Sequence, residues 1–474
     1  MRSPADFDSW AEGFAADWVR SNPQLATMTQ YFSGAEQDAL DRKLGLTGHF
    51  GVTYGRREAE EHKVLAQRGL SALREFDRAA LSSEQQSSAA ILEWRLQDAI
   101  ANAAFGQHRF IFTQMIGLHV GLISFLNAMH PIRSERDAEN YVARLGAVAG
   151  CLDDGISEAR GAARKGMIPP RFILERTIGQ LDKLSAGDPA NHILVTSLAD
   201  RLNANDVRTS QRDALLDAAK ERVVREIIPA FGRVKALLGE QLSRANDNSG
   251  AWALPDGASF YARQLATFTG SKLTPAEIHA VGLHEVERLE REMDAILREL
   301  GFRDGKLDER VLQLNESLGK NNGGRTRETI LTQLQAIVDD AERRSREFFN
   351  IRPRAPVTVR REPEFSERSA AAHYSPPAPD GSRPGIYWVP LGEFGPNVPW
   401  LGIGMKSTAY HEAIPGHHFQ LAIELEAEQL PHFRRRRAFG FDASYGEGWA
   451  LYSEHTCAEN NWYDGDVPSR LGYL

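Results

Sequence analysis

The chain has 474 residues, 25% of them charged, and a formal net charge of −8. That length suffices for a large core and two or three structural units. The mildly acidic balance argues against a nucleic-acid partner, which would need a basic face. Two cysteines, Cys151 and Cys457, make no disulfide framework and leave the redox compartment open, and we interpret Cys457 as a small buried hydrophobe.

The N-terminal residues are predicted to form the start of the folded domain. Phe7, Trp10, Phe14 and Trp18 recur at helical spacing and predict a first helix. No uninterrupted apolar run precedes them, so we expect no signal peptide here and a cytoplasmic location unless a leader has been removed.

Long amphipathic patterns follow at 56–105, 134–165 and 206–246. They predict helices, with a break near residues 81–83 where a serine can cap the next helix. The fold class that they indicate is mainly α.

One stretch, residues 110–129, carries no Asp, Glu, Lys or Arg. Polar residues interrupt it, and a lone membrane span is unusual in the middle of a helical chain. We therefore predict a buried core helix, polar where it meets a cleft, and no membrane span. His119 within it is expected to be a hydrogen-bonded core histidine.

A helix start is marked at Thr274, which can cap the helix, with Pro275 at its first position and Glu277 completing a capping box. The apolar face of this helix is predicted to pack in the core. It consists of Ile278, Val281, Val286, Leu289, Met293 and Ile296. A further helix is predicted over roughly 325–348.

Composition changes sharply at 351–400, where ten of the 22 prolines lie. Helices cannot persist through so many prolines. Apolar runs at 356–359 and 385–389 predict strands and a small β element near 356–389. The chain thus divides into a helical region 1–350 that forms cleft walls, this Pro-rich segment 351–400, and helices at 401–474.

The last region contains His411-Glu412-Ala-Ile-Pro415-Gly416-His417-His418. The zinc-helix pattern H-E-x-x-H is interrupted here, because proline stands where the second histidine would be. Pro415 and Gly416 predict a helix through His411 and Glu412, a bulge, and a resumed helix from His417. A bulge of two residues would restore the one-turn relation between His411 and His417, so we favour His417 as the second ligand, with His418 as the alternate.

A zinc hydrolase needs a third protein ligand and an open position for water. Glu447 is the candidate, because it begins an apolar helical stretch at Gly446-Glu-Gly-Trp-Ala-Leu-Tyr-Ser-Glu454. Glu454 lies two turns further on the same face and can hydrogen-bond a ligand histidine. The alternatives are a kinked, histidine-rich surface helix and a glutamate favoured at a helix start by the macrodipole.

Peptidases of the zincin type place an edge strand beside the metal helix, where an extended peptide pairs by strand addition. Residues 386–389 are proposed as that strand, with a plain structural hairpin as the alternative. Tyr374 could offer a hydroxyl to an oxyanion, although nothing in the sequence places it there.

The strings 407–420 and 446–454 resemble those of the bacterial domain-of-unknown-function 885 family, and shorter matches lie at 22–27, 141–145 and 384–388. The resemblance implies a large multi-helix, zincin-like metallopeptidase fold around a cleft. It also implies a zinc site made of His411, Glu412, His417 and Glu447. Family members continue with a further helical segment, so a transition-state tyrosine or histidine from that segment is expected to be absent.

The expected function is zinc-dependent hydrolysis of peptide bonds, with short peptides as substrates. Zn²⁺ held by His411, His417 and Glu447 activates water, and Glu412 acts as general base. Two alternatives stay open: hydrolysis of an ester or non-peptide amide, and an inactive metal- or peptide-binding protein. Substrate preference and oligomeric state are not predicted.

Overall fold

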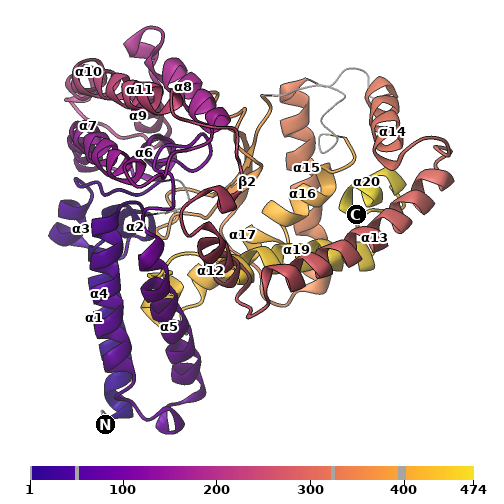
Figure 1. Cartoon of the computed structure of the whole chain (residues 1–474), viewed down its shortest axis with the longest axis horizontal. Helices are drawn as coiled ribbons and strands as arrows, with labels where there is room; N and C mark the ends of the chain where they lie inside the picture. The colour runs from indigo at the N-terminus through magenta and orange to yellow at the C-terminus, as the bar shows by residue number, and fades with distance from the viewer. Residues whose placement is uncertain (1–2, 49–52, 322–325, 393–401) are drawn as a thin grey trace. The chain divides into compact units, whose positions relative to one another are not determined.

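The computed structural model describes residues 3–48, 53–321, 326–392 and 402–474. These residues are mainly helical and contain one small sheet, which confirms the predicted fold class (Figure 1). It divides into two compact units. The first comprises Met1–Arg263 with Gln429–Gly440, and the second comprises Gln264–Glu428 with Phe441–Leu474. These units do not coincide with the segments delimited by composition at 350 and 400.

Antiparallel helices build the first unit. The predicted pattern over 56–105 is the pair α4 (Arg56–Leu73) and α5 (Ser83–Asn102), with a capping box between Ser82 and Gln85 at the break. The helix α7 (Glu135–Ala163) packs against α10 and α11. The other helices here are α1 (Phe7–Arg20), α2 (Pro23–Thr29), α3 (Gly34–Leu40), α6 (Leu118–Ser124), α8 (Arg171–Ser185), α9 (Ile193–Ala204), α10 (Arg212–Arg222), α11 (Ile228–Leu242) and α18 (His432–Arg435).

The uncharged stretch 110–129 is helical only in its second half, as α6 and a π-helical turn at Phe125–Met129. The expectation of one helix was wrong for 110–117, because the chain turns tightly at Gly117, where a Cβ would lie 2.4 Å from the Thr113 nitrogen. His119 is fully buried and faces the Gln180 Oε1 at 3.2 Å, as expected of a core histidine. Among the described residues, no helix is long and apolar enough to cross a membrane.

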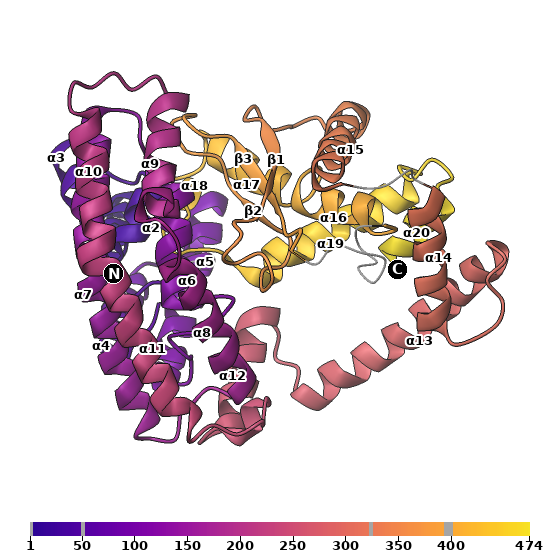
Figure 2. The same cartoon turned by 90° about the horizontal axis from the view of Figure 1, so that it is seen from above.

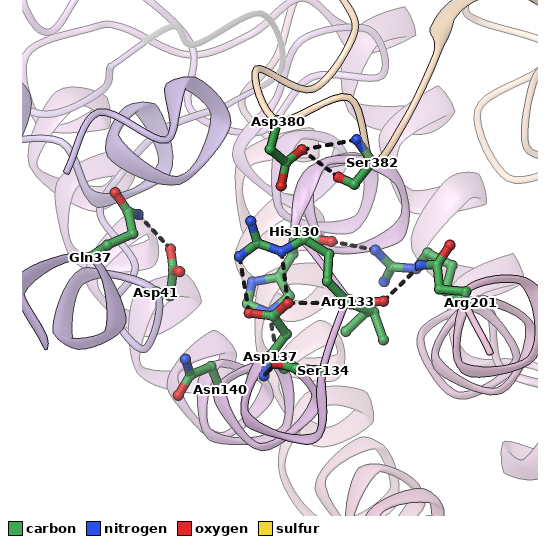
Figure 3. A network of polar contacts seen from close by, with 12 residues as sticks. Gln37, Asp41, His130, Arg133, Ser134, Asp137, Asn140, Arg201, Asp380 and Ser382 are labelled. Atoms are coloured by element: carbon green, nitrogen blue, oxygen red, sulfur yellow. Dashed lines mark hydrogen bonds and ion pairs between the residues drawn. The ribbon is translucent and has the colours of Figure 1, made fainter. Parts of the chain in front are cut away.

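Buried polar side chains join the start of α7 to its neighbours (Figure 3). The His130 Nε2–H donates to the Asp137 carbonyl at 3.1 Å, and its Nδ1 accepts from the Arg144 guanidinium at 2.8 Å. Arg201 donates to the carbonyl oxygens of His130 and Leu126. Burial and the neighbouring arginines lower the pKa of His130 well below its usual value, so the imidazole is a neutral structural element.

The sheet of the second unit contains β1 (Val357–Arg361), β2 (His373–Ser375) and β3 (Gly385–Val389) in the order β1-β3-β2. β3 pairs in parallel with β1 and antiparallel with β2, and all five of its residues are buried. Residues 386–389 are therefore a central strand, and the prediction of an edge strand was wrong. The short strand β2, followed directly by two prolines, occupies the edge that a peptide would have needed.

Around this sheet lie α15 (Arg327–Phe348), α16 (Met405–Glu412), α17 (His417–Glu426) and α19 (Ala443–Glu459) (Figure 2). The helix α20 (Val467–Tyr473) lies beyond them and packs against α16 and α19. The helix α16 packs against α15, α19 and α20. A continuous core includes Leu334 of α15, Tyr387 of β3, Ala409 of α16 and Phe419 of α17. The predicted helix at 325–348 and both predicted strands are thus confirmed.

The second unit also contains α13 (Pro275–Glu299) and α14 (Leu307–Asn321), while α12 (Gly257–Thr269) crosses the boundary between the units. Thr274 and Glu277 form the predicted capping box. Met293 and Ile296 pack in a small core with Leu297, whereas Val281 and Val286 are 57% and 51% exposed. The prediction of core packing was wrong for the first half of α13, because a periodic apolar face does not specify a partner.

Candidate metal centre

The interrupted motif folds into two helices joined by a turn. α16 ends at Glu412, residues 413–416 form the turn with a cis peptide before Pro415, and α17 begins at His417. The predicted interruption is confirmed, although the turn contains four residues. Gly416 is required there, since a Cβ would lie 1.8 Å from the His411 carbonyl oxygen and 2.4 Å from that of Tyr410.

The turn brings His411 and His417 together, and α19 adds Glu447. The Glu447 Oε2 lies 3.3 Å from the His411 Nε2 and 3.6 Å from the His417 Nε2. One ligand atom from each of the three lies within 4.8 Å of the others. Bonds of 2.0–2.1 Å to a tetrahedral zinc imply ligand separations of about 3.4 Å. The side chains therefore have the chemistry and spacing to hold Zn²⁺.

His411 is oriented by a chain of hydrogen bonds behind it. Its Nδ1 lies 2.8 Å from the Glu454 Oε1, as predicted from the shared helix face of Glu447 and Glu454. The Ser407 hydroxyl donates to the other Glu454 oxygen at 2.9 Å, and the Tyr463 hydroxyl lies 2.8 Å from Ser407. With Nδ1–H donating to a carboxylate, Nε2 is the nitrogen that faces Glu447 and would bind a metal in place of its proton.

The electrostatics of the centre favour a cation. Burial opposes protonation of His411, but contacts with Glu447 and Glu454 outweigh it and raise the pKa of His411 to about 10. Hydrogen bonds from His411 and His417 lower the pKa of Glu447 to about 2. Two carboxylates thus contact one imidazole, an arrangement that attracts positive charge.

Glu412, the predicted general base, is 6% exposed and lies within electrostatic reach of His411, His417 and Glu447. Burial raises the pKa of Glu412 to about 7. Sequence reasoning missed its neighbour Tyr387, which is fully buried and whose hydroxyl finds no hydrogen-bond partner among the described residues. Burial, with the nearby Glu412 carboxylate, raises the pKa of this phenol well above its usual value.

His418, the alternate ligand, points away from the cluster. Its Nδ1 lies 2.8 Å from the Tyr374 hydroxyl and its Nε2 lies 3.0 Å from the Ala355 carbonyl oxygen. Burial lowers the pKa of His418 to about 4, so the ring is neutral. The Tyr374 hydroxyl, considered above as an oxyanion donor, is engaged in this contact with His418. Of the two adjacent histidines, His417 is therefore the one that faces Glu447.

α19 begins at an Asp442 cap and carries Glu447 in its second turn. Of the two glycines beside Glu447, Gly446 permits close packing, since a Cβ there would lie 2.0 Å from the Phe441 ring. A Cβ at Gly448 would meet nothing within 4 Å, so only Gly446 is needed for packing. Phe441 also contacts His417, with ring centroids 6.1 Å apart.

Comparison with known proteins places the chain in a family. No curated protein matches the chain. A candidate lipoprotein of Colwellia psychrerythraea has a similar structure, with a TM-score of 0.79, 25% identity, and coverage of 98% of this chain and 80% of the other. A candidate lipoprotein of unknown function from Shewanella oneidensis aligns with a TM-score of 0.61, 16% identity, and coverage of 100% and 80%. Residues 45–474 match the family described as bacterial protein of unknown function, DUF885, and the chain therefore belongs to that family.

Proposed function

We propose that the chain is a zinc-dependent hydrolase that cleaves peptide bonds, with short peptides as its substrates. The observation that carries this proposal is the cluster of His411, His417 and Glu447. The Glu447 Oε2 lies 3.3 Å and 3.6 Å from the two histidine Nε2 atoms, close to the ligand separations of a zinc tetrahedron, and all three ligand atoms lie within 4.8 Å of one another. Two neutral nitrogens and one carboxylate, with one position left for water, are the donor set of catalytic rather than structural zinc sites.

The surroundings of the cluster support a catalytic centre. The Glu447 side chain is 52% exposed, so solvent reaches the ligand atoms from its side, whereas the His417 side chain is 9% exposed. Glu454 fixes the tautomer of His411, as carboxylates do for zinc-bound histidines. A buried carboxyl at Glu412 adds the proton acceptor that a purely structural site would not need.

Zinc bound there would polarise the scissile carbonyl and lower the pKa of water toward about 7. Glu412 accepts a proton from the attacking water and delivers it to the nitrogen of the leaving amine. Glu454 keeps the Nδ1 proton of His411 in place throughout. The low exposure of Glu412 limits competition from bulk water for this proton.

The proposal is tested by measuring zinc content and cleavage of a mixed peptide library in the wild type and in Glu412→Gln. We expect about one zinc per chain in both proteins and a loss of roughly 10²–10⁴-fold in kcat in the variant. Glu428→Gln is the matched control, because Glu428 is an exposed glutamate shortly after α17.

Unchanged peptide cleavage in Glu412→Gln would refute the assignment of the base. Zinc binding without peptide cleavage, together with turnover of esters, would replace the peptide substrate with an ester. Absence of zinc in the wild type after loading and removal of free metal would overturn the proposed function itself.

A further inference from the structure

The turn between the two metal histidines is hydrogen-bonded to α19 at the backbone carbonyl of Pro415. The Trp449 indole N–H donates to the Pro415 carbonyl oxygen at 2.9 Å. The Ser453 hydroxyl, one helical turn further along α19, lies 3.1 Å from the same oxygen and 2.8 Å from the Trp449 carbonyl. Two side chains of α19 therefore converge on the turn that separates His411 from His417.

The two histidines differ in how their rings are held. Glu454 binds the Nδ1 of His411, whereas the buried Nδ1 of His417 finds no partner among the described residues. Metal-binding histidines are normally oriented by a hydrogen bond at the nitrogen away from the metal. The position of the His417 ring therefore depends on its backbone, which directly follows Pro415 and Gly416.

We propose that Trp449, assisted by Ser453, is a positioning residue of the metal centre, which fixes His417 by holding the Pro415 carbonyl. The inference rests on the proposed zinc site for its functional meaning. The same helix that supplies Glu447 then also sets the distance from Glu447 to His417, because the ligand and both donors belong to one rigid element. The contact takes the place of a hydrogen bond at the His417 Nδ1, which has no partner among the described residues.

The test uses Trp449→Phe and the double variant Trp449→Phe/Ser453→Ala, which remove the donors and keep most of the packing. Hydrogen exchange of the metal-free proteins is measured over the peptide spanning 411–418. Loss of a net hydrogen bond makes this segment open more readily, so we expect its exchange to accelerate about 10-fold. Zinc affinity, measured by competition with a chromophoric chelator, should fall by roughly 10–100-fold.

A matched control is available in the same unit. The Trp388 indole N–H donates to the Ser375 hydroxyl at 2.9 Å, and both residues are buried. Trp388→Phe/Ser375→Ala removes the same kind of bond away from the turn. It should leave exchange of 411–418 and zinc affinity unchanged. Cobalt substitution adds a geometric readout, since only the Trp449 variants should alter the visible spectrum of the bound ion.

Wild-type exchange over 411–418 in the Trp449 variants would overturn the inference, as would faster exchange spread evenly over the whole second unit. Faster local exchange with unchanged zinc affinity would also overturn it, because the turn would then not position His417. If the wild type binds no zinc, the proposed function fails, and exchange alone decides whether the two donors hold the turn.

Discussion

The substitution Gly416→Ala gives the sharpest test of how the interrupted motif closes. A Cβ at residue 416 would lie 1.8 Å from the His411 carbonyl oxygen, whereas ordinary contact begins at 3.4 Å. The backbones on either side of the turn must therefore separate by about 1.6 Å. The obstructing atoms belong to the main chain of α16, so no side-chain rotation relieves the clash.

This displacement is large for a metal site, where ligand distances must hold to about 0.2 Å. We expect the zinc affinity of Gly416→Ala to fall by roughly 100-fold or more. Overpacking should lower the free energy of unfolding of the metal-free protein by about 1–3 kcal/mol. Chelator competition measures the first quantity, and denaturant unfolding measures the second.

Gly448→Ala is the matched control, because a Cβ there meets nothing within 4 Å and the residue lies inside α19. Alanine should raise the free energy of unfolding by about 0.5–1 kcal/mol and leave zinc affinity unchanged. Equal zinc affinity in Gly416→Ala and the wild type would refute the geometric reasoning, because the turn would then accept a Cβ at residue 416 without moving the metal ligands.

Three further predictions concern other side chains of the second unit. His417→Ala should abolish zinc binding while His418→Phe retains it, as zinc stoichiometry will show, because, of these two adjacent histidines, His417 faces Glu447 and His418 faces Tyr374. Glu454→Gln should weaken zinc binding by roughly 10–100-fold in chelator competition, since it removes the carboxylate behind His411. Burial raises the pKa of Glu362 from 4.5 to about 7. Its contribution to the free energy of unfolding is therefore full below pH 4.5 and is lost as the pH rises through 7. The free energy of unfolding of the wild type should fall by up to about 3 kcal/mol from this group across that pH range, and Glu362→Gln should remove that fall in denaturant unfolding.

The elements around the centre could be predicted where local chemistry decides them. Pro415 cannot continue a helix, and the predicted interruption between Glu412 and His417 is present. The predicted serine cap, at Ser82, and the predicted capping box, at Thr274, mark helix starts through contacts within one turn. The hydrogen bond from the His411 Nδ1–H to Glu454 was also anticipated, since helical periodicity places Glu454 on the face of Glu447.

Features decided by distant segments could not be predicted. The strand order β1-β3-β2 depends on β2, a strand of three residues before a proline pair, whose pairing with β3 has no local signal. The exposure of Val281 and Val286 on α13 depends on which surfaces lie opposite them. Tyr387 was predicted to belong to a strand, but its hydroxyl lies near Glu412 only because β3 packs against α16 in the same core.

α19 shows why one part of the centre was visible in the sequence and another was not. Glu447 and Glu454 act on side chains, and their acidic character beside a histidine motif indicates that role. Trp449 and Ser453 contact the backbone carbonyl of Pro415. Every residue has such a carbonyl, so the sequence does not indicate which one accepts a side-chain hydrogen bond. A tryptophan and a serine one turn apart are equally typical of core packing. Only the folded turn shows that their donors converge on the residue two positions before His417, where a small displacement changes the spacing of the metal ligands.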